Sequence, residues 1–535
     1  MKRPGSPRWP IRGIMADPAR LIERHEFYFE LLEWMAGWGL NTLWWHFTDD
    51  EGFMLQLDSH PELATPHAFS KPEMRRLLAR AAECGIDVVP EVESLGHARC
   101  ITHLPRYAEL ADGGEVGFNA ICPSHQRTLP LLAEIINEVA ELFPSRYLHA
   151  GMDEVDVGDC PRCRRRSRGR PKWWLYARHV KAIHEIVAAA GKQMIIWADH
   201  VEKAPAMLKV LPRDIVLAHW QYREIRPDAI RRSLKAGFRV IGCPALCHSG
   251  DMIAPNAANY ANMDDMTVTL AKLRPRSAVL GGVNTWWTLW RGLRDAYLPA
   301  VAYTGAMWTA GRSLPKVTFM RRFAQERLGL TGKTAGDALW VFTQAMPAQP
   351  EVAAALFDSP TDILSAVALA GHGRLTQRKD KLAAAVTALR AGAGKVGRLR
   401  RREFGAIWLA GQVGLLCCEQ VERLAEAVEH YRRAEQMHEM GHDPRRIAGR
   451  LRQTLAILRA MRCRAARAAA AVERQWDRTR YADDPKKGAF AGRRYSRDAL
   501  LPKLQRSARF LQRLEDSFGR AVAHYLNGGA FPFAL

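Results

Sequence analysis

The sequence lacks two features of membrane and secreted proteins. A membrane-spanning helix needs about 18 or more consecutive apolar residues, and no such run occurs in the 535 residues. The first residues, MKRPGSPRWPIRG, include no apolar stretch of the kind that directs secretion. We therefore expect neither a membrane span nor a secretory leader.

Cysteine is also sparse. Ten cysteines are scattered along the chain, which suits a reducing cytoplasm better than a disulfide framework. Cys160 and Cys163 form a single CxxC, and no second pair of ligands at zinc-binding spacing is obvious. We expect two free thiols in a loop, with no metal and no cofactor.

Acidic residues are outnumbered. Lys and Arg number 78 against 56 Asp and Glu, which gives a formal charge of +22. Such a charge would favour polyanions. The basic clusters at 161–172 and 398–404 are, however, of a kind that more often forms solvated faces or loops. A nucleic-acid partner is therefore not expected.

What is present from residue 11 to about 310 is a regular alternation of short apolar runs and amphipathic stretches. The runs are rich in Val and Ile and apolar on both faces, as strands of a buried parallel sheet are. Several helical stretches end in Gly just before the next run. Eight such alternations predict an α/β fold, a (β/α)8 barrel over 11–315. The runs lie at 11–17, 42–47, 87–93, 147–154, 193–199, 214–221, 239–244 and 278–287.

The two ends of the chain differ from this middle part. Residues 1–10 read as a short extension. After about residue 315 the strand pattern disappears, and long stretches rich in Ala, Leu and Arg predict an all-α domain over 316–535. This domain would pack on the barrel or mediate association, which leaves a homodimer open.

Polar and aromatic residues gather where the predicted strands end. In a (β/α)8 barrel the chemistry lies at the carboxyl ends of the strands. Carboxylates beside indole rings are the residue types that glycoside chemistry needs, for proton transfer and for stacking on a sugar ring. Two residues of these strands, Trp44 and His46, are expected to lie inside the barrel and not to contact a ligand. The strand-end residues are Arg12, Asp17, His46, Asp49, Asp50, Glu91, Glu93, His97, His149, Asp153, Glu154, Trp197, Asp199, His219, Trp220, Tyr222, His248, Asp251, Trp286 and Trp287.

Asp153 and Glu154 are the strongest catalytic candidates. Neighbouring residues on a regular strand point to opposite faces, so both can face one ligand only if the strand gives way to a loop there. Burial and like-charge repulsion would raise the pKa of one carboxyl and make it a suitable acid near neutrality.

Four sequence blocks, in order, resemble glycoside hydrolase family 20, the β-N-acetylhexosaminidases. RGIMADPAR (12–20) looks like the first strand of the family and NTLWWHFTDDEGFMLQLDSHPEL (41–63) like its second strand and loop. GIDVVPEVESLGH (85–97) is similar to the third-strand block, and HAGMDE (149–154) resembles the His-x-Gly-Gly-Asp-Glu signature. The resemblance covers roughly residues 11–310.

The resemblance implies a retaining, substrate-assisted mechanism on a terminal N-acetylhexosaminide, in which the 2-acetamido oxygen forms an oxazoline. Glu154 would be the general acid and then the base, and Asp153 would orient the acetamido group. Arg12 would bind the sugar's 3- and 4-hydroxyls. Asp49 and His97 would form a pair behind the acid. The remaining predicted binding residues are His149 in the signature and three pocket tryptophans, Trp197, Trp220 and Trp287.

Several positions depart from the family pattern. Trp44 stands in place of a His, Leu95 in place of a Pro, and Met152 in place of the second Gly of the signature. The seventh-strand Tyr has no counterpart in place, and Tyr222 and Tyr260 are the candidates. Leu289 stands where the eighth strand normally supplies a Glu that contacts the outer hydroxyls.

These departures keep two other functions open. The barrel could bind a sugar without turning it over, retaining its arginine and tryptophans. Alternatively, the chain could associate with a polyanion through its basic helical domain, which predicts a steep salt dependence of binding. The leading expectation is an enzyme acting on a small glycoside or oligosaccharide.

Overall fold

The computed structural model describes residues 9–20, 23–112, 120–248, 253–288, 292–370, 374–481 and 499–532. Within them, eight parallel strands form a ring that closes where β1 pairs with β11. The predicted (β/α)8 barrel is therefore confirmed. Its strands are β1 (Ile11–Ala16), β2 (Thr42–His46), β5 (Asp87–Glu91), β6 (Tyr147–His149), β7 (Gln193–Trp197), β8 (Val216–Trp220), β9 (Arg239–Cys243) and β11 (Val279–Trp286).

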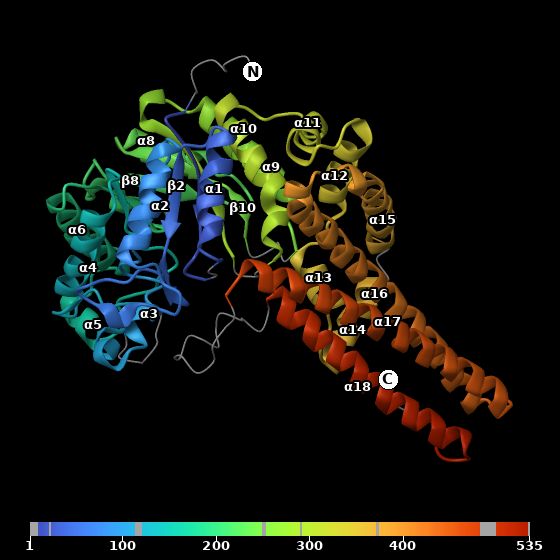
Figure 1. The fold of residues 1–535 in the computed structure, drawn as a ribbon. Helices are drawn as coiled ribbons and strands as arrows, with labels where there is room; N and C mark the ends of the chain where they lie inside the picture. Colours follow the sequence, from blue (N-terminus) through green and yellow to red (C-terminus); the bar gives the residue numbers. More distant parts are fainter. Residues whose placement is uncertain are drawn as a thin grey trace.

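Helices cover the outside of this ring (Figure 1). The sequence sets their ends locally: in α2 the Ser70 hydroxyl accepts from the Glu73 amide while the Glu73 carboxylate accepts from the Ser70 amide. The main covering helices are α1 (Glu26–Gly37), α2 (Lys71–Glu83), α4 (Thr128–Leu142), α6 (Lys172–Ala189), α8 (Pro227–Lys235), α9 (Ala257–Lys272) and α10 (Leu298–Ala310). Shorter elements are β3 (Thr48–Asp49), β4 (Gly52–Phe53), α3 (Arg99–Thr102), α5 (Pro161–Ser167), α7 (Asp199–Lys203) and β10 (Ala245–Cys247).

Both faces of each barrel strand are buried, which explains the unbroken apolar runs. Successive side chains of a strand alternate between the barrel interior and the helical layer. On β2, Trp44 belongs to the interior cluster, whereas Leu43 and Trp45 pack in the outer core. Trp44 is thus a core residue, as expected.

The helical region begins at α11 and packs on the barrel. One apolar core runs from the barrel into α11, α12, α15 and the first part of α16. A second core joins the far parts of α16, α17 and α18, which extend away from the barrel as a long bundle (Figure 1). The helices are α11 (Lys316–Leu328), α12 (Lys333–Ala345), α13 (Gln349–Ala355), α14 (Pro360–Ala370), α15 (Arg374–Gly392), α16 (Arg401–Glu439), α17 (Pro444–Thr479) and α18 (Leu500–Leu526).

Charged contacts also join the two parts. Arg402 of α16 lies 3.0 Å from the buried carboxylate of Asp295. Arg480, which follows α17, is buried and lies 3.1 Å from Glu23. The Arg480–Glu23 pair is buried on both sides and fixes this arrangement, because breaking it would leave a buried charge without compensation.

Among the described helices, α16 is long and apolar enough to cross a membrane, judged by length and composition alone. However, 67% of its most apolar stretch is buried inside the protein. A core helix of a large protein is apolar on most sides for the same reason. The absence of a membrane span stays a prediction.

Candidate active site

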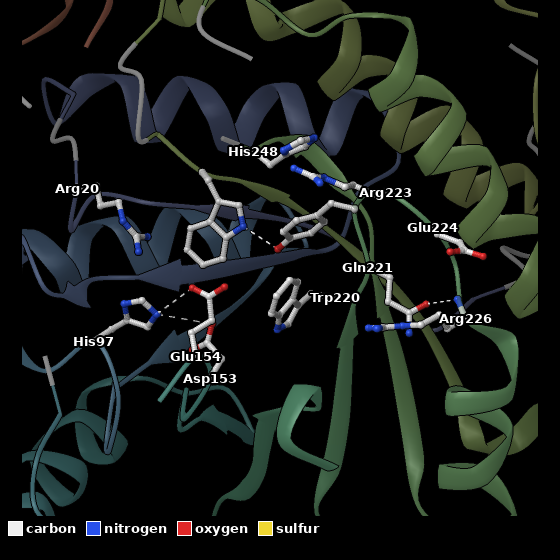
Figure 2. Close-up of a pocket in the computed structure, with 12 residues that line it drawn as sticks. Arg20, His97, Asp153, Glu154, Trp220, Gln221, Arg223, Glu224, Arg226 and His248 are labelled. Carbon is white, nitrogen blue, oxygen red and sulfur yellow. Dashed lines mark hydrogen bonds and ion pairs between the residues drawn. The ribbon is translucent and has the colours of Figure 1, made fainter. Parts of the chain in front are cut away.

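A pocket of about 470 Å³ opens at the carboxyl ends of the barrel strands (Figure 2). Its lining comes from the last residue of β8 and from segments that follow β1, β5, β6, β8, β10 and β11, where barrel enzymes carry their chemistry. The lining residues are Arg20, His97, Asp153, Glu154, Trp220, Gln221, Tyr222, Arg223, Glu224, Arg226, His248 and Trp287.

Asp153 and Glu154 both line this pocket because the regular strand ends before them. Strand β6 stops at His149. Beyond it, Gly151, Met152 and Glu154 adopt left-handed backbone conformations, with φ of 63°, 76° and 46°. These turns break the alternation of a strand and bring two adjacent carboxylates to one side. The requirement stated from the sequence is met.

The turn explains two positions of the signature. At Gly151 a Cβ would overlap the carboxylate of Glu93, so the left-handed φ and the close approach both require glycine. Met152 also has a left-handed φ, although it replaces the usual glycine. This costs about 1–2 kcal/mol of backbone strain, offset by a fully buried side chain and an amide that donates to Glu93 at 3.2 Å.

His97 connects the pair to the acidic residues behind it. Its Nε2 lies 3.6 Å from Glu154 Oε2 and 3.9 Å from Asp153 Oδ2. Its Nδ1 lies 3.2 Å from Asp50 and 3.9 Å from Asp49. The nearest partner of His97 is therefore Asp50, not the predicted Asp49. Burial alone would lower the pKa of His97, but Asp49 and Asp153 outweigh it and raise that pKa well above its ordinary value. His97 is a cation.

The two carboxyls of the pair have opposite pKa shifts. Burial raises the pKa of Asp153 to about 7, despite the opposing effect of His97. The hydrogen bond from His97 lowers the pKa of Glu154, whose side chain is 56% exposed. In the pocket without a ligand, the carboxyl that holds its proton near neutrality is Asp153 and not Glu154, the acid that the family resemblance implies.

Arg12 does not reach the pocket. It lies near the beginning of β1, at the amino ends of the strands, where its Nε donates to Gly39 O at 2.8 Å and its Nη1 to Trp9 O at 2.7 Å. The predicted sugar contact of Arg12 is wrong, because a side chain at the start of a barrel strand lies a full strand length from the catalytic rim.

Arg20 occupies the place expected of Arg12. It follows β1, lines the pocket, and lies 2.7 Å from Asp49 and 3.3 Å from Asp17. Its guanidinium stacks on Trp287, 4.8 Å from the ring centre. The sequence held a clue to this assignment, since Arg20 comes after the six-residue strand and Arg12 near its beginning.

A buried network supports the pocket from below. His46 lies 2.8 Å from Asp49 and 2.8 Å from Glu91. Glu91 also accepts from Trp197 Nε1 at 2.7 Å and lies 3.3 Å from His149. Burial lowers the pKa of His149 to about 4, so this ring is neutral. His46 is the interior residue that we expected.

His149 and Trp197 therefore do not line the pocket, contrary to the prediction for both. Each is fully buried, and their rings are 4.5 Å apart between centres in the barrel interior. They belong to strands β6 and β7 themselves, where inward side chains fill the barrel. Apart from Trp220, the last residue of β8, the residues that line the pocket come one or more positions beyond the strand ends.

Aromatic rings form another part of the pocket wall. Trp220, Tyr222 and Trp287 line it, and Trp287 Nε1 donates to the Tyr222 hydroxyl at 2.7 Å. Of the two candidate tyrosines, Tyr222 belongs to the site, whereas Tyr260 packs against Tyr303 on the helical side. Two positions considered from the sequence, Asp251 and Leu289, lie outside the described residues.

The comparison with known families agrees with this geometry. The family model described as "Glycosyl hydrolase family 20, catalytic domain" matches residues 9–288. The chain belongs to glycosyl hydrolase family 20. The match takes in every strand of the barrel and leaves helices α11–α18 outside the family 20 domain.

Individual relatives are similar over the barrel. A beta-hexosaminidase of Vibrio furnissii is 28% identical over 276 residues, 44% of this chain and 43% of that protein. A beta-N-acetylhexosaminidase of Cellulomonas fimi is 29% identical over 258 residues, 44% of this chain and 48% of that one. The chain thus spans about half the length of these two relatives.

The fold is shared with solved structures as well. The crystal structure of the beta-N-acetylhexosaminidase from Bacteroides fragilis NCTC 9343 matches with a TM-score of 0.52 at 22% sequence identity. The match covers 60% of this chain and 70% of that one. At this level of identity the likeness concerns the fold alone.

Proposed function

We propose that the protein hydrolyses glycosides with a terminal β-linked N-acetylhexosamine, GlcNAc or GalNAc, by a retaining, substrate-assisted mechanism. One observation carries this proposal: Asp153 and Glu154 present adjacent carboxylates to one side of the pocket. The other carboxylate among the described lining residues is Glu224, which Figure 2 shows beyond Trp220 at the far end.

This arrangement favours a nucleophile supplied by the substrate. A retaining enzyme with its own nucleophile places two carboxyls on opposite sides of the scissile bond, about 5 Å apart. Adjacent residues on one loop do not flank a bond in this way. Family 20 enzymes are among the exceptions in which the 2-acetamido oxygen attacks the anomeric carbon and forms an oxazoline.

Glu154 and Asp153 would then have different roles in the reaction. Glu154 donates a proton to the departing glycosidic oxygen, and its carboxylate later removes a proton from the water that opens the oxazoline. Asp153 accepts a hydrogen bond from the acetamido N–H and stabilises the positive charge that develops there. Asp153 Oδ1 is buried and has no hydrogen-bond partner among the described residues, so it is available for this contact.

The walls suit a sugar. The indole faces of Trp220 and Trp287 offer apolar surface to a pyranose ring and to the acetamido methyl. Arg20, fixed by Asp17 and Asp49, is a charged donor for the outer hydroxyls. These contacts orient the substrate, while the reaction itself rests on the carboxylate pair.

The pKa values indicate how the proton is held. Between the lowered pKa of Glu154 and the value of about 7 for Asp153, the pair carries one proton. A bound sugar would cover Glu154 and exclude water, which raises its pKa toward that of an acid. The proton would then pass from Asp153 to Glu154, and the Asp153 carboxylate would accept the acetamido N–H.

Aryl glycosides test the proposal. We expect turnover of the 4-nitrophenyl N-acetyl-β-glucosaminide or -galactosaminide and none of the matched β-glucoside, which has a hydroxyl in place of the acetamido group. Replacing the acetamido methyl by trifluoromethyl should slow the reaction strongly, because the carbonyl oxygen becomes a weaker nucleophile. A thiazoline mimic of the oxazoline should inhibit.

Variants of the pair complete this test. Glu154→Gln and Asp153→Asn should each reduce kcat by about 100-fold or more, whereas Glu224→Gln, a matched pocket carboxylate, should keep most activity. Wild-type turnover in both pair variants would refute the roles. Binding of N-acetylglucosamine without hydrolysis of any aryl glycoside would instead favour a sugar-binding barrel.

We further propose a cytoplasmic location, since the ten cysteines are all free and free thiols persist in a reducing compartment. Cell fractionation would test this. The homodimer and the absence of a nucleic-acid partner stay predictions, which sedimentation and a low-salt DNA-binding assay would check.

A further inference from the structure

Three cysteines and an aspartate meet between the segments that follow β5 and β6, and none of them lines the pocket. Asp112, Cys122, Cys160 and Cys163 are all buried, and one donor atom of each lies within 4.8 Å of the others. From the sequence, the CxxC at Cys160 and Cys163 offered only two ligands. The fold adds two more from a segment about 40 residues earlier in the chain.

The backbone holds these residues in place on both sides. Residues 111 and 121 form an antiparallel bridge. Next to it, the Asp112 amide donates to Ala120 O at 2.9 Å, and the Cys122 amide donates to Leu110 O at 2.7 Å. On the other side, Cys160 and Cys163 lie one turn apart at the start of α5.

The distances match a tetrahedral metal site. Donors about 2.3 Å from a zinc ion at the corners of a tetrahedron are about 3.8 Å apart. Cys122 Sγ lies 3.5 Å from Cys160 Sγ and 3.6 Å from Cys163 Sγ, and Asp112 Oδ1 lies 3.7 Å from Cys163 Sγ. These separations are too long for disulfides, whose sulfurs are about 2.05 Å apart, and all ten cysteines are free.

The surroundings favour thiolates around a cation. The Cys163 amide donates to Cys160 Sγ at 3.3 Å, and Ser124 Oγ lies 3.2 Å from Cys163 Sγ, where its hydroxyl can donate to a thiolate. Outer hydrogen bonds of this kind orient metal ligands. Leu175 closes the cluster on its apolar side.

Asp112 supplies an independent indication. Its side chain is buried and contacts the Gly158 amide and the Cys163 thiol, and no Lys, Arg or His of the described residues lies within ion-pair distance of it. A buried carboxylate without a compensating cation is costly. A metal ion at the centre of the cluster would provide that compensation.

We propose that these four side chains bind one structural zinc ion. Three thiolates and a carboxylate are ligands that zinc accepts in a closed tetrahedral site. With Zn²⁺ they have a net charge of −2, and the six arginines and one lysine of 161–172 lie beside it in sequence. The basic cluster would thus compensate the site.

The zinc ion would anchor the loop that carries the catalytic pair. Cys160 follows Glu154 by six residues, and between them the Gly158 amide donates to Asp112 Oδ2 at 3.3 Å. The ion therefore ties the segment after β6 to the segment before α4. Its role is structural, since all four ligand positions are filled by the protein.

Metal analysis of the full-length protein tests this inference. Protein purified without chelators from zinc-supplemented cells should contain about one zinc per chain. Cys122→Ser and Cys163→Ser should lose most of it, whereas Cys84→Ser, a half-buried cysteine away from the cluster, should keep it. A chelator should release the ion from the wild type and lower its Tm, and added zinc should restore the Tm.

Wild-type protein without stoichiometric zinc, and with a Tm that neither chelator nor zinc changes, would overturn the proposal. Iron in place of zinc would overturn the choice of metal. If a cysteine variant does not fold, the fall in the Tm of the wild type with a chelator and its recovery with added zinc still test the proposal. None of these readouts depends on turnover, so an inactive protein that contains zinc would refute the proposed reaction and leave the zinc site standing.

Discussion

Replacing Asp153 by Asn should stabilise the protein above neutral pH while it strongly reduces activity. The Asp153 side chain is 8% exposed, and burial raises its pKa from 3.8 to about 7. The folded state therefore binds this proton more tightly than the unfolded state does. An asparagine is similar in shape and cannot ionise, so it escapes the cost of a buried charge.

The sign and size of the change in stability follow from the difference between the pKa of Asp153 in the folded and in the unfolded protein. Below about pH 4 Asp153 is protonated in both the folded and the unfolded protein, so its raised pKa does not reduce the free energy of unfolding. Between pH 4 and 7 the unfolded chain releases the proton that the folded chain retains, so the stability of the wild type falls as pH rises. Above pH 7 the loss is complete, at about 4 kcal/mol from 1.36 kcal/mol per pKa unit. Asp153→Asn should therefore gain up to this amount at pH 8 and little at pH 4.

Thermal unfolding of the two proteins from pH 4 to 8.5 measures the effect. A gain of this size corresponds to a Tm higher by roughly 5–10 °C at pH 8 for a domain of this size. Glu154→Gln is the matched control. The pKa of Glu154 is lowered, so its ionised form stabilises the fold above pH 4.5, and the variant should show no gain at pH 8. An unchanged Tm of Asp153→Asn at pH 8 would refute the argument that burial keeps Asp153 protonated.

Three other predictions concern the same site. The dependence of kcat/KM on pH should be bell-shaped, with its alkaline limb near the pKa of about 7 that Asp153 shows; a flat profile from pH 6 to 9 would contradict a singly protonated pair. Arg20→Lys should lower kcat/KM about 10- to 100-fold through lost fork geometry, whereas Arg12→Lys should change it less than about twofold; equal losses would contradict the placement of the two arginines. Gly151→Ala should reduce Tm more than Gly169→Ala, because both have a left-handed φ but a Cβ meets Glu93 only at the first; equal Tm losses would show that the overlap relaxes freely.

Local pattern was sufficient to predict the barrel. Strand runs and helix ends depend on residues close together in the chain, through burial periodicity and capping. The eight predicted runs each contain one observed strand, and the last helix of the barrel ends at Ala310, near the predicted boundary at 315. The position of Asp153 and Glu154 in the pocket was also predictable, since both lie just beyond a strand at the carboxyl end of the barrel.

Tertiary structure decided which side chains meet at the rim. Arg12 and Arg20 occur in one short block of sequence, and only the length and direction of β1 place the second in the pocket. His149 and Trp197 look like strand-end residues, but their strands direct them into the barrel interior. A shift of one residue along a strand reverses the direction of a side chain, and a linear pattern does not locate strand ends that finely.

Tertiary structure also decided the charges and the proposed metal site. The proton stays on Asp153 because burial, and the carboxylate of Asp199 beyond β7, outweigh the opposing charge of His97 beyond β5. Cys122 and Cys160 lie 38 positions apart in the chain and meet in the fold. Burial and pairwise distance depend on the whole fold, whereas strand and helix patterns depend on nearby residues. For this reason the sequence by itself determined the architecture and indicated the type of chemistry, and the folded structure determined which side chains meet in the pocket.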